Sequence, residues 1–329
     1  MLRLHAGGRP GQRSHRRLLQ VPRARGCLTD VDPAVFGLIL VAAGLHVSWN
    51  VLLKTAGDPL RAAWVGMMTG ALIMVPLGFI GWLVAGRPAI SGQVVLLAAI
   101  SGAIEGVYFV LLSMAYRRGD LSVVYPVARG TAPLLAVFIG VAFLGERLGP
   151  VAIFGIGAVL VGLLALQRPW RSFRLVRTRA GAGLANGSGF AFGAGVMIAL
   201  YSAVDRVAVR LVEPWLYAAL LWLAMAISVN VIVFGSRGLF SDERASTNVD
   251  VPRAAFGGAI TLAAYFLILI ALSLAPLAVV APLRESAIVL ASGWGALRLG
   301  ETAGWRSAAS RIAAASIVLA GAILLALGR

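Results

Sequence analysis

Ten stretches of about 20 mainly apolar residues follow one another along the chain, each bounded by charged residues or by Gly and Pro. A helix needs about 20 such residues to cross the roughly 30 Å hydrocarbon core of a membrane. Only 13% of the residues are charged, against about a quarter in soluble domains. The sequence therefore predicts an all-α membrane protein with ten transmembrane helices. They are expected at 34–53, 62–84, 92–115, 122–144, 150–167, 183–205, 214–235, 255–275, 278–298 and 306–327.

The second half of the chain repeats the first at a spacing of about 155 residues. Because each copy contains an odd number of predicted helices, the second copy is inverted relative to the first. Inverted repeats are typical of secondary transporters, whose binding site lies between the repeats near the midplane. The matches are LSVVYP (121–126) with LAVVAP (277–282), Arg129 with Arg284, the LGE motifs at 144–146 and 299–301, Trp49 with Tyr201, and Lys54 with Arg206.

A basic linker separates the two predicted repeats, and a basic tail precedes them. The tail lacks the apolar core of a signal peptide, so we expect it to be disordered. A further hypothesis is that translation starts at Val31, which N-terminal sequencing that found Met1 would exclude. The predicted divisions are a tail at 1–30, a first repeat at 31–167, a linker at 168–182 and a second repeat at 183–329.

The net charge of +16 comes from arginines in the tail and in short interhelical loops. Loops of this kind follow the positive-inside rule, whereas a nucleic-acid-binding protein would carry a basic face on a folded domain. Once the tail is counted, the loops on the two sides of the membrane carry nearly equal numbers of basic residues. The orientation of the termini therefore stays open. Cys27 is the only cysteine, and no Cys/His spacing predicts a metal site or cofactor.

The run EGVYFVLLSMAYRRGDLSVVYPVARGTAPLLAVFIGVAFLGERL at 105–148 resembles the first repeat of the EamA-type transporters of the drug/metabolite transporter superfamily. GLHVSWNVLLK (44–54), APLRES (281–286) and the paired LGE motifs extend the resemblance to residues 31–327. It implies two inverted five-helix repeats that carry small metabolites by alternating access, in a multi-pass protein that we expect in the bacterial inner membrane. The family's cargo ranges over amino acids, sugars, nucleotides and drugs, so the substrate is not named.

Ionisable side chains within the predicted spans are the main candidates for substrate contact. An unpaired charge at the bilayer centre costs at least about 2.5–3.5 kcal/mol, so Arg129, Arg284, Glu105, Glu285 and Asp205 must face a cavity or a partner. One interpretation is that the two arginines bind a carboxylate or phosphate of the substrate. The alternative is that two Arg and two Glu neutralise one another and fix the helices. The duplication favours the first interpretation.

Two of these acids and two prolines bear on mechanism. Glu105 and Glu285 are the only acids deep enough in the spans to carry protons, so proton coupling is a hypothesis and exchange is its alternative. Pro126 and Pro282 precede the arginines, and a proline inside a helix removes a backbone hydrogen bond. They predict either a kink near the helix start or a broken helix along the substrate path.

Polar and aromatic residues share one face of the first predicted helix. His46, Trp49, Asn50 and Lys54 recur at helical spacing, which predicts a pore lining. The alternative is that Trp49 anchors the helix at the membrane interface and that Lys54 extends to the headgroups. Two tyrosines are further predicted wall residues, Tyr108 one turn from Glu105 and Tyr125 close to Arg129.

Other motifs favour structural roles. Glycine pairs with GxxxG spacing let transmembrane helices approach closely; they are Gly66/Gly70, Gly102/Gly106 and Gly189/Gly193. Glu146 is predicted to lie near the positive N-terminus of the next helix along the chain. No GxxxxGK[ST] sequence is present, which disfavours transport driven by ATP.

The predicted function is a secondary transporter of a small polar or anionic metabolite. An intramembrane enzyme would need a nucleophile with its base or a set of metal ligands, and no Ser/His/Asp or HExxH arrangement is present. A structural or sensory membrane protein is the other alternative, and the polar, duplicated centre argues against it. The expected partners are a small-molecule substrate and the lipid bilayer but no nucleic acid, and a homodimer is left open.

Overall fold

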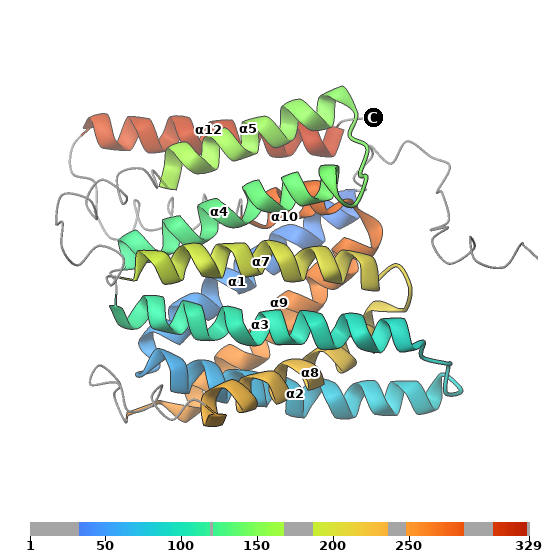
Figure 1. Ribbon diagram of the computed structural model, residues 1–329. Helices are drawn as coiled ribbons and strands as arrows, with labels where there is room; N and C mark the ends of the chain where they lie inside the picture. The colour runs from blue at the N-terminus through green and yellow to red at the C-terminus, as the bar shows by residue number, and fades with distance from the viewer. Residues whose placement is uncertain (1–32, 119–120, 168–186, 236–247, 286–304, 328–329) are drawn as a thin grey trace, which may run out of the picture.

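The computed structural model describes residues 33–118, 121–167, 187–235, 248–285 and 305–327, which form ten helices (Figure 1). The only β-structure in these ranges is an isolated bridge between Gly57 and Val249. The predicted all-helical class is confirmed for this part of the chain. The helices are α1 (Pro33–Thr55), α2 (Pro59–Val84), α3 (Gly92–Arg118), α4 (Leu121–Ala142), α5 (Pro150–Gln167), α7 (Ser188–Ala208), α8 (Pro214–Gly235), α9 (Val251–Leu274), α10 (Leu277–Glu285) and α12 (Trp305–Leu327).

Six of these helices, α1, α2, α3, α7, α8 and α9, are long and apolar enough to cross a membrane. Shorter apolar stretches lie in α4, α5 and α12. Of the ninth predicted segment, 278–298, only the first part lies in the described residues, as α10. The predicted tail, 1–30, and the whole predicted linker, 168–182, lie outside the described residues.

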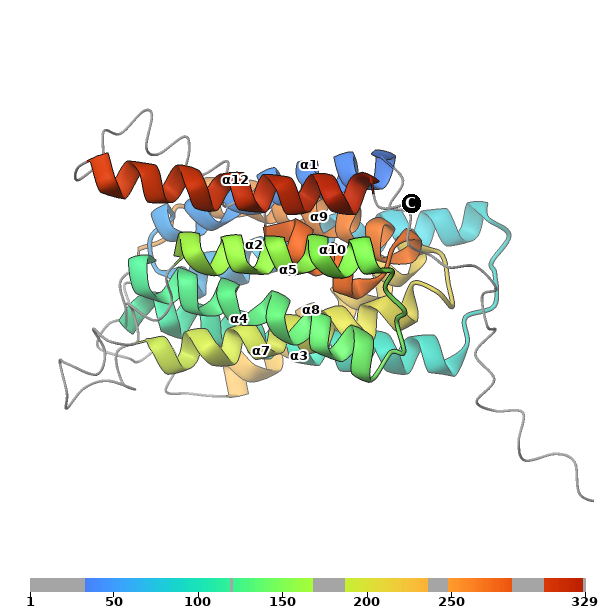
Figure 2. The ribbon, with the colours of Figure 1, turned by 90° about the horizontal axis from the view of Figure 1, so that it is seen from above.

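The principal helix contacts join the first half of the chain to the second. Helix α3 packs against α7 and α8, and α9 packs against α1 and α2. Helix α4 contacts α7 and α10, while α5 pairs with α12 along one edge of the bundle (Figures 1 and 2). The two halves are therefore interleaved in one core rather than folded side by side.

The direction of the helices follows from two reciprocal backbone hydrogen bonds. Asp58 N–H donates to the carbonyl of Asn248 at 3.0 Å, and Asp250 N–H donates to that of Ala56 at 2.9 Å. The end of α1 and the starts of α2 and α9 therefore meet at one end of the bundle. The start of α1 and the end of α12 lie together at the opposite end (Figures 1 and 2).

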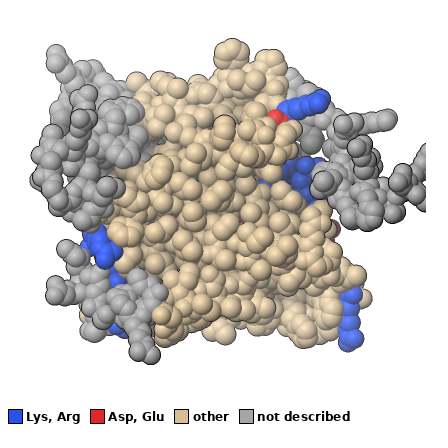
Figure 3. Space-filling view, in the orientation of Figure 1, with Lys and Arg blue, Asp and Glu red and all other residues tan. Residues whose placement is uncertain are grey.

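The exterior between these two ends is apolar. Large hydrophobic side chains are strongly exposed there, including Leu72 at 76%, Val84 at 83% and Phe154 at 73%. Figure 3 shows a broad face without charge, with Lys and Arg at the edges that correspond to the bundle ends. Such a surface suits hydrocarbon rather than water, because exposed apolar patches of this extent are rare on soluble monomers.

Small residues bring α3 and α8 into close contact. A Cβ added at Gly102 would lie 2.7 Å from the backbone nitrogen of Met225, and one at Gly106 would collide with Ser228. Glycine at both positions lets the two backbones approach, as the GxxxG spacing predicts. This close contact sets the distance between helices that line the central cavity.

Candidate functional site

Four predicted site residues meet in one buried ionic cluster. Arg129 of α4 donates from Nη1 to Oε1 of Glu285 at 3.0 Å, and its Nη2 lies against Nε2 of His46 of α1. Arg284 donates from Nε to the same Glu285 oxygen at 3.3 Å. Arg129 and Glu285 are each 3% exposed and Arg284 is 6% exposed. The cluster joins α1, α4 and α10.

Two ion pairs of this cluster join two arginines to one carboxylate. Two guanidinium groups face one carboxylate, Glu285, and within the described residues Glu105 forms no ion pair with either arginine. The sequence-based alternative was that two Arg and two Glu neutralise one another. Among the described residues, Glu285 takes part in such ion pairs and Glu105 does not. Two neighbouring guanidinium groups are suited to binding a carboxylate or phosphate.

His46 connects the cluster to a central cavity. Trp49, Glu105 and Tyr108 line the same cavity, so four predicted residues are brought together there. Helices α1, α3, α7, α8 and α9 all contribute lining residues. The cavity has a volume of only about 20 Å³, which is room for about one water molecule. The structure is therefore closed around its centre.

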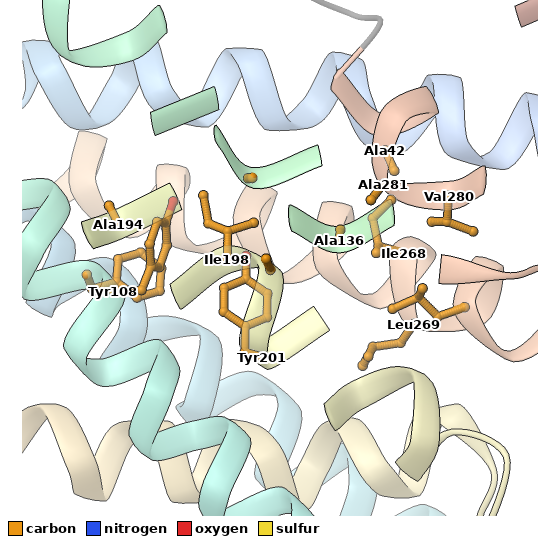
Figure 4. Close-up of a cluster of buried hydrophobic side chains, with 14 of the residues drawn as sticks. Ala42, Tyr108, Ala136, Ala194, Ile198, Tyr201, Ile268, Leu269, Val280 and Ala281 are labelled. Carbon is orange, nitrogen blue, oxygen red and sulfur yellow. The ribbon is translucent and has the colours of Figure 1, made fainter. Parts of the chain in front are cut away.

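Aromatic rings form a continuous wall of this cavity. The ring centroids of Tyr108 and Tyr201 are 5.8 Å apart and those of Tyr201 and Tyr265 are 6.0 Å apart, all in edge-to-face orientation. Trp49 packs on Phe109 at 5.7 Å. Figure 4 shows Tyr108 and Tyr201 within the buried core. Sequence reasoning proposed Tyr108 but did not select Tyr201 or Tyr265, although Tyr201 is the counterpart of Trp49 in the duplication.

Two buried indole groups around the cavity lack a hydrogen-bond partner. Trp49 is 3% exposed and Trp222 is 1% exposed. In the described residues, Nε1 of neither side chain has an acceptor. A buried donor without an acceptor costs about 1–3 kcal/mol, and both of these donors belong to side chains that line the cavity.

Asp205 of α7 forms a second polar centre that the predicted site did not include. Its Oδ1 accepts from Ser101 at 2.5 Å and from Tyr217 at 2.7 Å, and its Oδ2 accepts from Tyr265. The residue is 0% exposed and joins α7 to α3, α8 and α9. The sequence signal that could have identified Asp205 as a site residue is its charge within an apolar span.

Of three further predicted residues, Asn50 has another role, and the side chains of the other two are not among those that the structure describes. Asn50 is absent from the cavity lining; its Nδ2 donates to the His46 carbonyl at 2.6 Å, and its Oδ1 accepts from Tyr116 at 3.3 Å. Asn50 therefore ties α1 to α3. The side chains of Lys54 and Tyr125 lie outside the described residues.

Neither predicted helix-breaking proline ends a helix. Pro126 lies in the second turn of α4, and Pro282 lies in the second turn of α10. Over the residues that the structure describes, α4 and α10 both continue through these prolines. A proline this near a helix start removes only one intrahelical hydrogen bond, so the helix continues through it.

Contacts at the two ends of the bundle close the site. At the end where α2 begins, Asp58 receives Arg117 of α3 through two hydrogen bonds of 2.9 and 2.7 Å. The carboxylate also caps α2 by accepting from the Arg61 N–H at 3.0 Å. Bidentate pairs of this kind are strong and directional, so Asp58 fixes α3 to α2.

At the other end, Glu146 of the α4–α5 loop caps α10. Its oxygens accept from the backbone N–H groups of Leu277 at 2.7 Å and Ala278 at 2.9 Å, and Arg206 lies 3.4 Å away. The prediction that Glu146 lies at the next helix along the chain, α5, is wrong. The tight turn at Gly145, with φ of 65°, directs Glu146 across to the second half instead.

No metal site is indicated by the part of the chain that the structure describes, where no three His, Cys, Asp or Glu side chains gather closely enough to hold an ion.

The apolar exterior, the all-helical core and the buried ionic centre define a multi-pass membrane protein. Residues 34–167 match the EamA-like transporter family. This segment is similar to the proteins of that family, and the resemblance identified in the sequence is confirmed over these residues.

No curated protein sequence matches the chain. Among solved structures 29 chains match. One, described only as "Crystal structure of protein", aligns with a TM-score of 0.62 over 90% of this chain and 97% of its own, at 20% identity. At that identity the likeness supports the fold alone.

Proposed function

We propose that the protein is a secondary transporter made of two inverted five-helix repeats, 31–167 and 183–329, which moves a small anionic metabolite by alternating access. The observation that carries the proposal is the cluster in which Arg129 and Arg284, counterparts in the duplication, share the single carboxylate Glu285 beside a closed cavity. The EamA-like match over 34–167 supports the first repeat.

The helix contacts support a twofold relation between the halves. If α1 to α5 correspond to α7, α8, α9, α10 and α12, the contact of α3 with α7 has its counterpart in that of α9 with α1. The contact of α3 with α8 likewise corresponds to that of α9 with α2. The contact of α4 with α7 corresponds to that of α10 with α1. The pairs α2 with α8, α4 with α10 and α5 with α12 join an element to its own counterpart.

The direction of the chain supports inversion. Helices α2 and α9 begin at the same end, because Asp58 N–H donates to Asn248 and Asp250 N–H donates to Ala56. Helix α3 returns after α2 has crossed the bundle, so α3 and its proposed counterpart α9 run in opposite directions. Inverted repeats place the binding site between them, where the cavity is found.

The closed cavity corresponds to an occluded state of an alternating-access cycle. It is too small for a metabolite, and both ends are fastened, one by Asp58 with Arg117 and the other by Glu146 with α10. Opening toward either side requires that one fastening is released while the other holds. The guanidinium groups of Arg129 and Arg284 and the two indole N–H groups would then bind an anion with hydrogen-bond acceptors.

The proposal is tested by thermal unfolding of the detergent-purified protein with named probes. Acetate, benzoate, succinate, inorganic phosphate and phenyl phosphate are compared with benzamide, a neutral analogue of benzoate. We expect at least one anion, and not benzamide, to raise the unfolding temperature. Arg129→Ala and the gentler Arg129→Lys should abolish or reduce that shift. Arg253→Lys, at an exposed residue that is 47% accessible, is the matched control and should retain it.

Transport is then measured as counterflow of the stabilising anion in proteoliposomes. Uptake of labelled anion against preloaded unlabelled anion is the expected result. Stabilisation by benzamide as strong as by benzoate, a shift that survives Arg129→Lys unchanged, or the absence of counterflow would each overturn the proposal.

A further inference from the structure

Two hydroxyl groups of α9 belong to the lining of the central cavity, and both donate their protons elsewhere. Thr261 and Tyr265 line the cavity and lie four positions apart, so they share one face of the helix. Thr261 donates from Oγ1 to the carbonyl of Gly257 at 2.8 Å, and Tyr265 donates to Oδ2 of Asp205. A hydroxyl group has one proton and two lone pairs. Both oxygen atoms can therefore only accept a hydrogen bond from a molecule in the cavity, and we call Thr261 and Tyr265 the acceptor face of α9.

Asp205 fixes the direction of the Tyr265 hydroxyl group. It also accepts from Ser101 at 2.5 Å and from Tyr217 at 2.7 Å. Three donors stabilise an ionised carboxylate, which has no proton to give back to Tyr265. Of these four residues, only Tyr265 is among the cavity-lining residues in the described part of the chain. Asp205 is thus a positioning residue that acts on the cavity through Tyr265.

The remaining polar lining residues divide into donors and acceptors. Trp49 of α1 and Trp222 of α8 contribute indole N–H groups. Glu105 of α3 contributes a carboxyl group, which can accept in either protonation state. A simple anion has acceptors only, so it would pair with the indole groups and leave the oxygen atoms of α3 and α9 without a donor. Buried polar groups without a partner weaken binding.

We propose that the substrate carries a hydrogen-bond donor, such as a hydroxyl or an N–H group, in addition to its anionic group, and that the acceptor face of α9 selects for this donor. The inference rests on the proposed transport function. The anionic group binds at Arg129 and Arg284, and the donor binds to the oxygen atoms of Thr261 and Tyr265. A substrate with an ether oxygen in this place would set lone pairs against lone pairs, so the site disfavours it.

The first test compares hydroxyl and methoxyl forms of the same anion in the detergent-purified protein. The pairs are glycolate with methoxyacetate, malate with methoxysuccinate, para-hydroxybenzoate with para-methoxybenzoate, and para-hydroxyphenyl phosphate with para-methoxyphenyl phosphate. In at least one pair we expect the hydroxyl member to have an apparent Kd about two- to tenfold lower than both its methoxyl partner and the unsubstituted anion, as one net hydrogen bond predicts. A methoxyl member that binds as tightly as the hydroxyl member in every pair would overturn the proposal.

The second test changes the direction of the Tyr265 hydroxyl group from outside the cavity. Asp205→Asn keeps the shape of the side chain. The oxygen of the new amide accepts from Ser101 and Tyr217, so its nitrogen faces Tyr265 and donates to it. The Tyr265 proton then turns toward the cavity, and the variant should lose the hydroxyl preference or reverse it in favour of the methoxyl member. A preference that Asp205→Asn leaves unchanged would show that Asp205 does not set the polarity of this face.

Tyr217→Phe is the matched control for Tyr265→Phe. Both tyrosines donate to the same carboxylate, but Tyr217 is not among the described lining residues. Both variants should lower the unfolding temperature, whereas only Tyr265→Phe should remove the hydroxyl preference. Thr261→Val should reduce the preference and Thr261→Ser should keep it, which decides the role of the acceptor face even if Tyr265→Phe does not fold. Equal loss of the preference in Tyr217→Phe and Tyr265→Phe would contradict a direct contact.

The two proposals fail in different ways. If unsubstituted anions bind and undergo counterflow while no hydroxyl member binds more tightly than its unsubstituted form, the donor inference is overturned and the transport function stands. If no probe of either series binds and no counterflow occurs, the transport function fails and the donor inference fails with it.

Discussion

Glu146 accepts the backbone N–H of Leu277 at 2.7 Å, although 131 positions separate the two residues in the chain. A loop of the first half thereby caps the first turn of α10 in the second half. The same carboxylate receives the N–H of Ala278 at 2.9 Å and the guanidinium of Arg206 at 3.4 Å. Because Arg284 and Glu285 lie at the end of α10, this cap helps to position the ionic cluster.

Replacing Glu146 with Ala should destabilise the protein. The change leaves two backbone N–H groups without a partner, at about 1–3 kcal/mol for each buried donor, and removes the anion beside Arg206, which is 7% exposed. We expect a clear fall in the thermal unfolding temperature in detergent. Glu213→Ala, in the exposed α7–α8 loop, is the control. Equal unfolding temperatures for the two variants would contradict the cap.

The shared carboxylate of the ionic cluster predicts an order of stabilities. Glu285→Gln leaves both Arg129 and Arg284 without their anion, whereas Arg129→Gln leaves Glu285 still paired with Arg284. Removing one partner of a buried ion pair costs about 3–5 kcal/mol, so Glu285→Gln should unfold at the lower temperature. Arg253→Gln breaks an exposed pair and should cost less than about 1 kcal/mol. The reverse order of the first two variants would show that Glu285 is not the centre of the cluster.

The contact between α3 and α8 predicts that Gly102→Ala is destabilising. The added Cβ would lie 2.7 Å from the Met225 nitrogen, and backbone atoms cannot give way as a side-chain end can. Overpacking of this kind costs about 1–3 kcal/mol. Gly157→Ala in α5 is the matched control, because nothing lies within 4 Å of the added atom. There the better helix propensity of Ala should leave stability equal or raise it by about 0.5–1 kcal/mol.

Most of the helical framework could be predicted from the sequence, because a hydrocarbon core imposes a length and a composition that apolar segments reveal directly. The charged members of the site could be predicted for a related reason. A charge in an apolar span needs a partner or a cavity, so Arg129, Arg284, Glu105 and Glu285 are conspicuous in the sequence. The structure accordingly brings three of them into one cluster and places Glu105 in the cavity wall.

The neutral part of the site could not be predicted, since helices that are apolar on every side do not reveal which face points inward. Tyr265 and Trp222 are indistinguishable in sequence from residues at the membrane interface, and Asn50 shares a helical face with His46 without lining the cavity. Tyr201 could have been found through its correspondence with Trp49. Glu146 was assigned to the wrong helix because its partner lies far away in the chain.

The unpaired indole groups provide the last prediction. Trp64 donates from Nε1 to Asn230 at 3.0 Å, whereas Trp49 and Trp222 have buried Nε1 atoms without an acceptor in the described residues. A change of Trp to Phe removes ring volume in every case. At Trp64 it also breaks a hydrogen bond, at a net cost of about 0.5–1.5 kcal/mol. At Trp49 and Trp222 it removes a donor that was unfavourable to bury, which offsets the lost packing.

We therefore expect Trp49→Phe and Trp222→Phe to lower the unfolding temperature of the ligand-free protein less than Trp64→Phe. Their effect on the stabilisation by the anionic probe should be the opposite, since an indole N–H that faces the cavity gains its acceptor only when the anion enters. Trp64→Phe should leave the probe-induced shift unchanged. If all three variants lose stability equally and retain the full shift, the two indole groups do not bind the substrate.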